Sequence, residues 1–167
     1  EILTRARELT GEDFVMGIRM SGDEMVASGL SQAECVEIAQ RMAASGLVDF
    51  VSVMAAQGRD YRSNANSYIG MDAGPAPYLH LASAIKAEID LPIFHATRIT
   101  DLSTAARAVE DGHVDMVGMT RAFISDPHLA RKLTEGREED IRQCVGAAYC
   151  VDRVLQSRDT LCIQNAS

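Results

Sequence analysis

Short apolar runs alternate along the chain with segments of helical periodicity. Four runs of four or more apolar positions predict buried strands, over residues 14–20, 48–54, 91–96 and 114–119. Apolar positions at helical spacing predict helices over residues 1–9, 31–45, 78–88, 101–111 and 126–136. Because strands that are apolar throughout are typical of parallel sheets covered on both faces, this β-α order predicts an α/β fold with parallel pairing.

Local signals mark several of the element ends. Ser31 and Glu34 have the spacing of a capping box, and Gly46 stops the helix that they start. Asp126-Pro127 predicts a helix with proline at its first position, which Gly136 ends. Between them, residues 55–77 read as one long polar loop, and loops of this length tend to be functional or mobile.

Four βα units fit either a small open sheet or half of a (β/α)₈ barrel. Functional groups of such barrels gather at the carboxyl ends of the strands. The polar residues of this chain follow the predicted strands in that way: Arg19 and Ser21, Asp60 and Tyr61, residues 95–98, and Thr120 with Arg121. We therefore favour half a barrel, which would leave two unpaired sheet edges and favour self-association.

Composition narrows the class of protein. The 167 residues are 47% hydrophobic, enough for one domain with a sizeable core, and the net charge is −8, which argues against nucleic acid or an anionic membrane as a partner. No apolar run approaches the roughly 20 residues of a membrane span, and no signal peptide precedes Glu1. Four cysteines in a sequence without secretory features indicate a protein of the reducing cytoplasm. The absence of an initiating Met indicates a piece of a longer protein.

Three of the four cysteines cluster near the end of the chain. Cys144, Cys150 and Cys162 are separated by five and eleven residues. Thiols at such short spacing suit a redox metal site better than structural bridges. The remaining cysteine, Cys35, has apolar neighbours on a predicted helix and reads as a core thiol.

Four segments together resemble the Old Yellow Enzyme-like flavin oxidoreductases, in the branch that contains trimethylamine dehydrogenase, histamine dehydrogenase and 2,4-dienoyl-CoA reductase. They are residues 17–21, 92–101, 115–127 and the cysteine segment. Within the last of these, residues 146–150 are similar to bacterial N-methylproline and dimethylglycine demethylases. The resemblance implies an FMN-binding (β/α)₈ barrel of which residues 1–140 are the C-terminal half, strands five to eight, followed by an iron–sulfur-type cysteine segment at residues 141–167.

The resemblance also implies roles for the two arginines that carry it. Arg19 would approach the N1–C2=O edge of the flavin and stabilise negative charge in the reduced ring. Its alternative is an internal ion pair, with Asp49 or Asp60. Arg121 would clamp the FMN phosphate, assisted by the backbone at Thr120, and its alternative is a surface arginine that caps the following helix.

Three further residues are candidates by position. Thr97 occupies the place of a family glycine, so its hydroxyl would replace a backbone contact to the phosphate, and Arg98 would lie near the phosphate or be a solvated loop arginine. Asp60 matches an aspartate that, in the amine dehydrogenases, joins a Tyr–His pair near the substrate. Its alternative is plain turn chemistry.

Cys144, Cys150 and Cys162 match three of the family's four cluster ligands, and Ala147 stands at the fourth place. A substitute ligand, a [3Fe–4S] form and a site without metal all stay open, as does the interpretation that the three are reduced cysteines packed in a loop.

The implied function is oxidative demethylation of an N-methylated amine or amino acid by hydride transfer to FMN. One alternative is NAD(P)H-dependent reduction of activated C=C bonds through the same flavin, and another is a non-catalytic half-barrel that self-associates. The first half of the barrel, and NAD(P)H- or FAD-binding domains, would belong to the rest of the parent chain. The residues that contact a small-molecule substrate would lie there too, so we expect this chain alone to be inactive.

Overall fold

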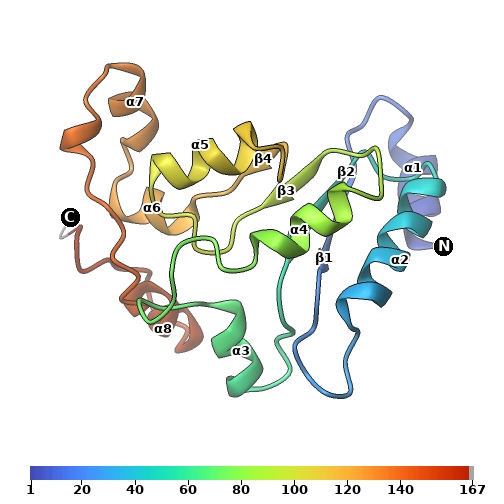
Figure 1. Ribbon diagram of the computed structural model, residues 1–167, viewed down its shortest axis with the longest axis horizontal. Coiled ribbons are helices and arrows are strands. Elements are labelled where there is room, and N and C mark those ends of the chain that lie inside the picture. The colour runs from blue at the N-terminus through green and yellow to red at the C-terminus, as the bar shows by residue number, and fades with distance from the viewer. Residues whose placement is uncertain (166–167) are drawn as a thin grey trace.

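The computed structural model describes residues 1–165 as a parallel sheet flanked by helices (Figure 1). The strands are β1 (Gly17–Ser21), β2 (Phe50–Met54), β3 (Ile93–His95) and β4 (Met116–Val117). They pair in the order β1-β2-β3-β4 and every pair is parallel. The prediction of an α/β fold with four parallel strands is confirmed. The end of the predicted cysteine segment, residues 166–167, lies outside the described residues.

Helices precede, connect and follow the strands. They are α1 (Ile2–Thr10), α2 (Gln32–Ala44), α3 (Tyr61–Ser67), α4 (Leu79–Lys86), α5 (Leu102–Glu110), α6 (Thr120–Ser125), α7 (Leu129–Thr134) and α8 (Tyr149–Leu155), with a short 3₁₀ turn η1 (Glu138–Asp140). The capping box that starts α2 is present: the Ser31 hydroxyl accepts from the Glu34 N–H, and the Glu34 carboxylate accepts from the Ser31 N–H at 2.9 Å. Gly46 follows α2 with a φ of 65°, the left-handed conformation expected of a glycine stop.

Two sequence predictions about the helices are wrong. The predicted loop over residues 55–77 contains α3, which starts because the Asp60 carboxylate accepts from the Ser63 N–H at 2.8 Å. The predicted helix over residues 126–136 begins only at Leu129, with His128 as its N-cap. Asp126 instead ends α6, a helix that the apolar pattern did not reveal because it follows β4 almost directly.

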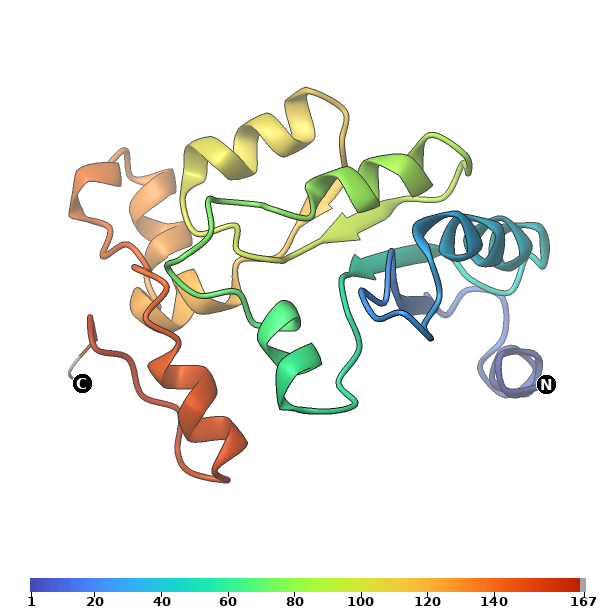
Figure 2. The ribbon, with the colours of Figure 1, turned by 60° about the horizontal axis from the view of Figure 1, so that its bottom comes forward.

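One face of the sheet carries the main core. Helices α2, α4 and α5 lie on that face, as Figure 2 shows, and side chains such as Val51, Val53 and Ile93 pack there against Leu81 and Ile85. A smaller core beyond the carboxyl ends of β3 and β4 joins α5, α6 and α7. It consists of Ile99, Ala105, Met119, Ala122 and Leu129. The second core fixes α6 at the end of β4.

The other face of the sheet is only partly covered. The rings of Phe50 and Phe94 stack there with centroids 4.6 Å apart, and Gly17 lies against the Phe50 ring, where a side chain would clash. Met116 of β4 is the pairing partner of Phe94 in β3, and its side chain is 49% exposed. Arg19 belongs to the same face, because it lies two residues from Gly17 on β1 and side chains alternate along a strand. No helix within residues 1–165 is long and apolar enough to cross a membrane.

Candidate functional site

The site lies where the strands end. Because all four strands are parallel, their carboxyl ends meet at one edge of the sheet, and the loops that follow them converge there. A cavity of about 380 Å³ opens at this edge. Its walls come from β1, the loop after β3, the C-terminal end of α3, the first turns of α6, and α8 with the residues after it.

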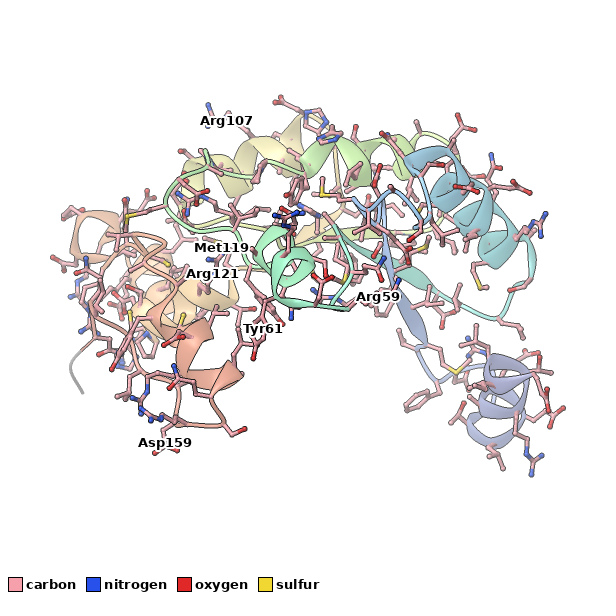
Figure 3. All side chains as sticks on the ribbon, turned by 90° about the horizontal axis from the view of Figure 1, so that it is seen from below. Arg59, Tyr61, Arg107, Met119, Arg121 and Asp159 are labelled. Atoms are coloured by element: carbon pink, nitrogen blue, oxygen red, sulfur yellow. The ribbon has the colours of Figure 1, made fainter. Side chains whose placement is uncertain are left out.

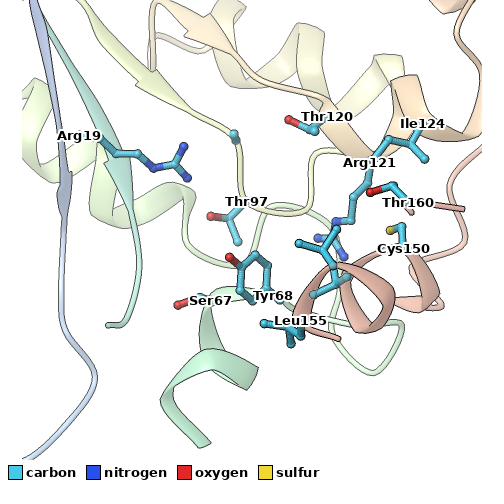
Figure 4. Close-up of a pocket in the computed structure, with 13 residues that line it drawn as sticks. Arg19, Ser67, Tyr68, Thr97, Thr120, Arg121, Ile124, Cys150, Leu155 and Thr160 are labelled. Carbon is cyan, nitrogen blue, oxygen red and sulfur yellow. The ribbon is translucent and has the colours of Figure 1, made fainter. Parts of the chain in front are cut away.

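Arg19 and Arg121 both line this cavity. Figure 4 shows Arg19 reaching in from β1 and Arg121 from α6, with Thr97 and Tyr68 between them. The two side chains come from opposite ends of the sheet order, since β1 is one edge strand and α6 directly follows β4, the other. The fold therefore brings together two cations that lie about a hundred residues apart in the sequence.

Arg19 has no carboxylate within 4 Å among residues 1–165. The ion pair considered as its alternative role does not form. Asp49 instead pairs with Arg7 at 2.9 Å, and the Asp60 carboxylate is bonded at the start of α3. Arg19 is exposed at the carboxyl end of the sheet, and its guanidinium is left without a carboxylate partner in this part of the chain.

Arg121 is also free of carboxylate partners in the described residues. One guanidinium nitrogen, Nη1, donates to the backbone carbonyl of Ile69 at 2.6 Å. This bond holds the side chain between α6 and the loop after α3. Figure 3 shows Arg121 among α6 and the C-terminal segment, whereas Arg107 projects from α5 on the far side of the molecule.

The other predicted cofactor contacts divide into two groups. Thr97 and Thr120 line the cavity, but Arg98 does not. The Arg98 Nε donates to the carbonyls of Ala73 and Gly74, at 2.8 and 3.1 Å. Its Nη1 is buried without a hydrogen-bond partner in the described part of the chain. Arg98 thus ties the loop after β3 to the loop that precedes α4, and its contact with a cofactor stays a prediction.

Asp60 does not line the cavity either. Its carboxylate accepts from the backbone N–H of Ser63 and from the Ser63 hydroxyl, and these bonds lower the pKa of Asp60. The structure therefore assigns Asp60 a place at the N-terminus of α3, in agreement with the turn chemistry considered for it. Its catalytic role is a prediction that depends on groups outside this chain.

The three clustered cysteines line one small cavity next to the larger one, and Arg121 and Cys150 border both. The small cavity measures about 20 Å³. Burial raises the pKa of the Cys150 thiol; the nearby Cys144 and Cys162 act in the same direction, and Arg121 opposes them. Within residues 1–165, no three His, Cys, Asp or Glu side chains are placed to share one metal ion.

Sequence reasoning missed the side chains that close the cavity. Val151, Val154 and Leu155 form an apolar wall from α8, and Ser67 and Tyr68 contribute from the end of α3. The spacing of the α8 residues, at i, i+3 and i+4, is that of one helical face and could have revealed the wall. The α3 residues fell within the stretch read as a loop.

His95 is the first of the polar residues 95–98 noted at a strand end, but the sequence assigned it no role. It is 1% exposed, and its Nδ1 lies 3.0 Å from the Val53 carbonyl. A carbonyl only accepts, so Nδ1 carries the proton. Burial lowers the pKa of His95, with Arg19 and His80 adding to the effect. A neutral imidazole therefore supports the sheet behind the cavity and does not line it.

The geometry defines a class: a parallel α/β sheet with an arginine-lined cavity at the carboxyl ends of its strands. Comparison with known proteins gives the family. Residues 1–140 match the NADH:flavin oxidoreductase / NADH oxidase family. The chain belongs to that family, whose members bind FMN.

Two relatives resemble the chain over its whole length. The N,N-dimethylglycine/sarcosine dehydrogenase of Chromohalobacter salexigens is 44% identical over 167 residues, all of this chain and 24% of that protein. The probable N-methylproline demethylase of Rhizobium meliloti is 41% identical over 174 residues, all of this chain and 25% of that protein. Among solved structures, a complex of 2-naphthoyl-CoA reductase superposes with a TM-score of 0.88 at 30% identity, over 98% of this chain and 24% of that one. The chain spans about a quarter of the length of these relatives.

Proposed function

We propose that this chain is the C-terminal half, strands five to eight, of an FMN-binding (β/α)₈ barrel. The observation that carries the proposal is the pair of guanidinium groups, Arg19 and Arg121, on one cavity without a carboxylate partner in residues 1–165. Arginine binds phosphate oxygens through two parallel hydrogen bonds. The cavity volume, about 380 Å³, lies within the range of small-molecule sites. The residues present therefore fit a flavin nucleotide.

In this proposal the parent enzyme removes a methyl group from an N-methylated amine or amino acid. FMN, when bound, supplies the hydride acceptor: the substrate loses a hydride from its N-methyl carbon, and water hydrolyses the resulting iminium to formaldehyde and the demethylated amine. The two relatives at 44% and 41% identity, whose names describe a dimethylglycine/sarcosine dehydrogenase and an N-methylproline demethylase, support this substrate class.

The residues of this chain bind and orient the cofactor. Arg121 holds the phosphate, and the hydroxyl groups of Thr97 and Thr120 offer additional donors on the same cavity. Arg19 stabilises negative charge on the flavin ring, because its guanidinium has no other anion nearby in the described chain. The apolar wall of α8 keeps water from that side of the cavity.

The groups that contact the substrate come from the rest of the parent chain in this proposal. Strands β1 and β4 are the two edges of the sheet, and each pairs on one side only within residues 1–165. The missing half of the barrel would pair with both edges and cover the face that holds Phe50 and Phe94. The isolated chain is accordingly expected to show no turnover.

The experiment is an assay of the intact protein that carries this chain. It is purified, its visible spectrum is recorded, and substrates ¹³C-labelled at the N-methyl carbon, dimethylglycine and N-methylproline, are supplied with an artificial electron acceptor. The proposal expects flavin absorbance that bleaches on addition of substrate, and labelled formaldehyde. A protein that releases no formaldehyde from either substrate, or turnover by residues 1–167 alone, would contradict it.

The alternative reaction is NAD(P)H-dependent reduction of an activated C=C bond. The likeness to 2-naphthoyl-CoA reductase favours it, since that structure matches 98% of this chain. The same preparation separates the two. Oxidation of NAD(P)H that depends on an enoate substrate, without formaldehyde release from the labelled amines, would establish the reductase. A chain that dimerises and leaves the spectrum of added FMN unchanged would indicate a non-catalytic, self-associating module.

A further inference from the structure

The cysteine segment, residues 144–162, is one ligand short of a four-thiolate cluster. A [4Fe–4S] cluster takes one thiolate at each iron. The segment supplies Cys144, Cys150 and Cys162, and Ala147 stands between the first two. The remaining cysteine of the chain, Cys35, is 1% exposed in α2 and does not line either cavity.

Nearby oxygen donors do not complete the set. The carboxylate of Asp152 accepts from the Gln156 side chain at 2.8 Å, and the Tyr149 hydroxyl lies 3.4 Å from Nη1 of Arg153. Both contacts run along α8 between exposed groups. Neither oxygen is therefore held ready for iron.

The space between the thiols is also too small. The cavity that Cys144, Cys150 and Cys162 share measures about 20 Å³. A single water needs roughly 10–15 Å³ of such volume, so the cavity holds about one water and not a cluster of irons and sulfides. Val145 and Ile163 line the same small cavity beside the three cysteines.

Protein hydrogen bonds already fix the segment in place. The buried Asp126 accepts from the Arg142 N–H at 3.0 Å, just before the first cysteine. The Arg142 side chain donates to the Asn165 side-chain oxygen at 3.1 Å, and the Asn165 amide donates to the Ile124 carbonyl at 3.2 Å. Both ends of the segment are thus tied to α6 and to each other, which is the task that a metal performs in segments that fold only around one.

The segment has another task, because it closes the large cavity. Cys150, Val151, Val154, Leu155 and Thr160 all line it, on the side opposite the strand ends (Figure 4). We propose that the cysteine segment is a wall of the flavin cavity whose three cysteines are reduced thiols, and that it carries no iron–sulfur cluster. The role as a wall rests on the proposed function, whereas the arguments from ligand number and space do not.

The first test measures metal in the intact protein. It is purified without oxygen, incubated with ferrous iron and sulfide, and desalted; FMN, iron and acid-labile sulfide are then determined. We expect bound FMN, iron far below the flavin content, and the same visible spectrum for Cys144→Ser. Iron and sulfide in stoichiometric ratio to FMN, lost in Cys144→Ser, would overturn the proposal.

The variant Ala147→Cys shows whether the missing fourth thiolate or the small cavity prevents cluster binding. A cluster in Ala147→Cys but not in the natural chain supports the proposal and attributes the loss to the missing ligand. No cluster in either supports it and attributes the loss to the closed cavity, whereas a cluster in both overturns it. A protein with neither flavin nor iron would contradict the proposed function and leave the ligand argument standing, so the two failures are distinguishable.

The second test addresses the wall. Leu155→Ala shortens a wall side chain that is 50% exposed, and Leu133→Ala, on α7, is the matched control at 40% exposure and away from the cavity. We expect Leu155→Ala to raise the dissociation constant of FMN roughly fivefold, because the shorter side chain buries less apolar surface against the bound nucleotide. The control should leave the constant unchanged. Equal constants for both variants and the natural protein would refute the role as a wall.

Discussion

Asp126 is the residue whose removal the structure predicts to be most destabilising. Its side chain is fully buried, and its carboxylate accepts from the Lys132 ammonium at 2.5 Å and from the N–H groups of His128 and Arg142, both at 3.0 Å. Asp126→Ala leaves two N–H groups without their acceptor, and it leaves the largely buried Lys132 ammonium with the Asp140 carbonyl, at 2.7 Å, but without a carboxylate. Breaking a buried pair in this way costs about 3–5 kcal/mol.

The assay is urea unfolding followed by circular dichroism. With a slope of about 1–3 kcal/mol per molar for a protein of this size, the expected destabilisation moves the midpoint by about 1 M or more. The control is Glu37→Ala, which removes an exposed ion pair with Arg41 and should cost at most about 1 kcal/mol. Equal midpoints for the two variants would refute the reasoning.

The pH dependence provides a second readout of the same carboxylate. The Lys132 ammonium and the Arg142 N–H hold the pKa of Asp126 well below its ordinary value of 3.8. The unfolded chain therefore binds this proton more readily than the folded one, so the contribution is fully present above pH 3.8 and is lost as the pH falls below it. The natural protein should lose stability over that acidic range more steeply than Asp126→Asn.

Three smaller predictions concern local structure. Ser31→Ala removes the N-cap of α2 and should lower the free energy of unfolding by about 1 kcal/mol, measured in urea. Gly118→Ala should lower the free energy of unfolding because the new Cβ would lie 2.8 Å from the Ala96 Cβ. A second change, Ala96→Gly, should restore part of that stability, and no restoration would contradict the packing argument. Gly146→Ala combines a φ of 76° with a clash against the Arg98 guanidinium, and it should expose the cysteine segment to faster proteolysis than the natural chain; equal cleavage rates would contradict it.

The strands, their order and the cap of α2 could be predicted from the sequence because each depends on local pattern. Ser31 caps α2 with its own side chain, and four apolar runs in a β-α order leave few topologies open. The two arginines were identified because they lie near the carboxyl ends of predicted strands, in segments that resemble the flavin oxidoreductases. The prediction that the two arginines share one cavity also depended on the strands being parallel, because only then do their carboxyl ends meet at one edge of the sheet.

The contents of residues 55–77 and 120–165 could not be predicted in the same way. Helices α3, α6 and α8 have six or seven residues, too short for periodicity to identify them. Their positions depend on long-range contacts, such as the bond from Arg121 to Ile69 and the bond from Arg142 to Asn165. The sequence predicts Arg98 as a cofactor contact, but in the structure its side chain donates to the Ala73 carbonyl and so links two loops.

The central claim is that Arg19 and Arg121 serve one flavin nucleotide. Its most direct test is the dissociation constant of FMN for the intact protein and for Arg19→Met, Arg121→Met and the control Arg107→Met, on the far side of the molecule. The loss of one charge-assisted phosphate bond, about 1.5–3 kcal/mol, predicts about a 10- to 150-fold weaker constant for Arg121→Met. Arg19→Met should also weaken binding, more for reduced than for oxidised flavin, while the control is unchanged. Constants for Arg19→Met and Arg121→Met equal to that of the control would contradict the account.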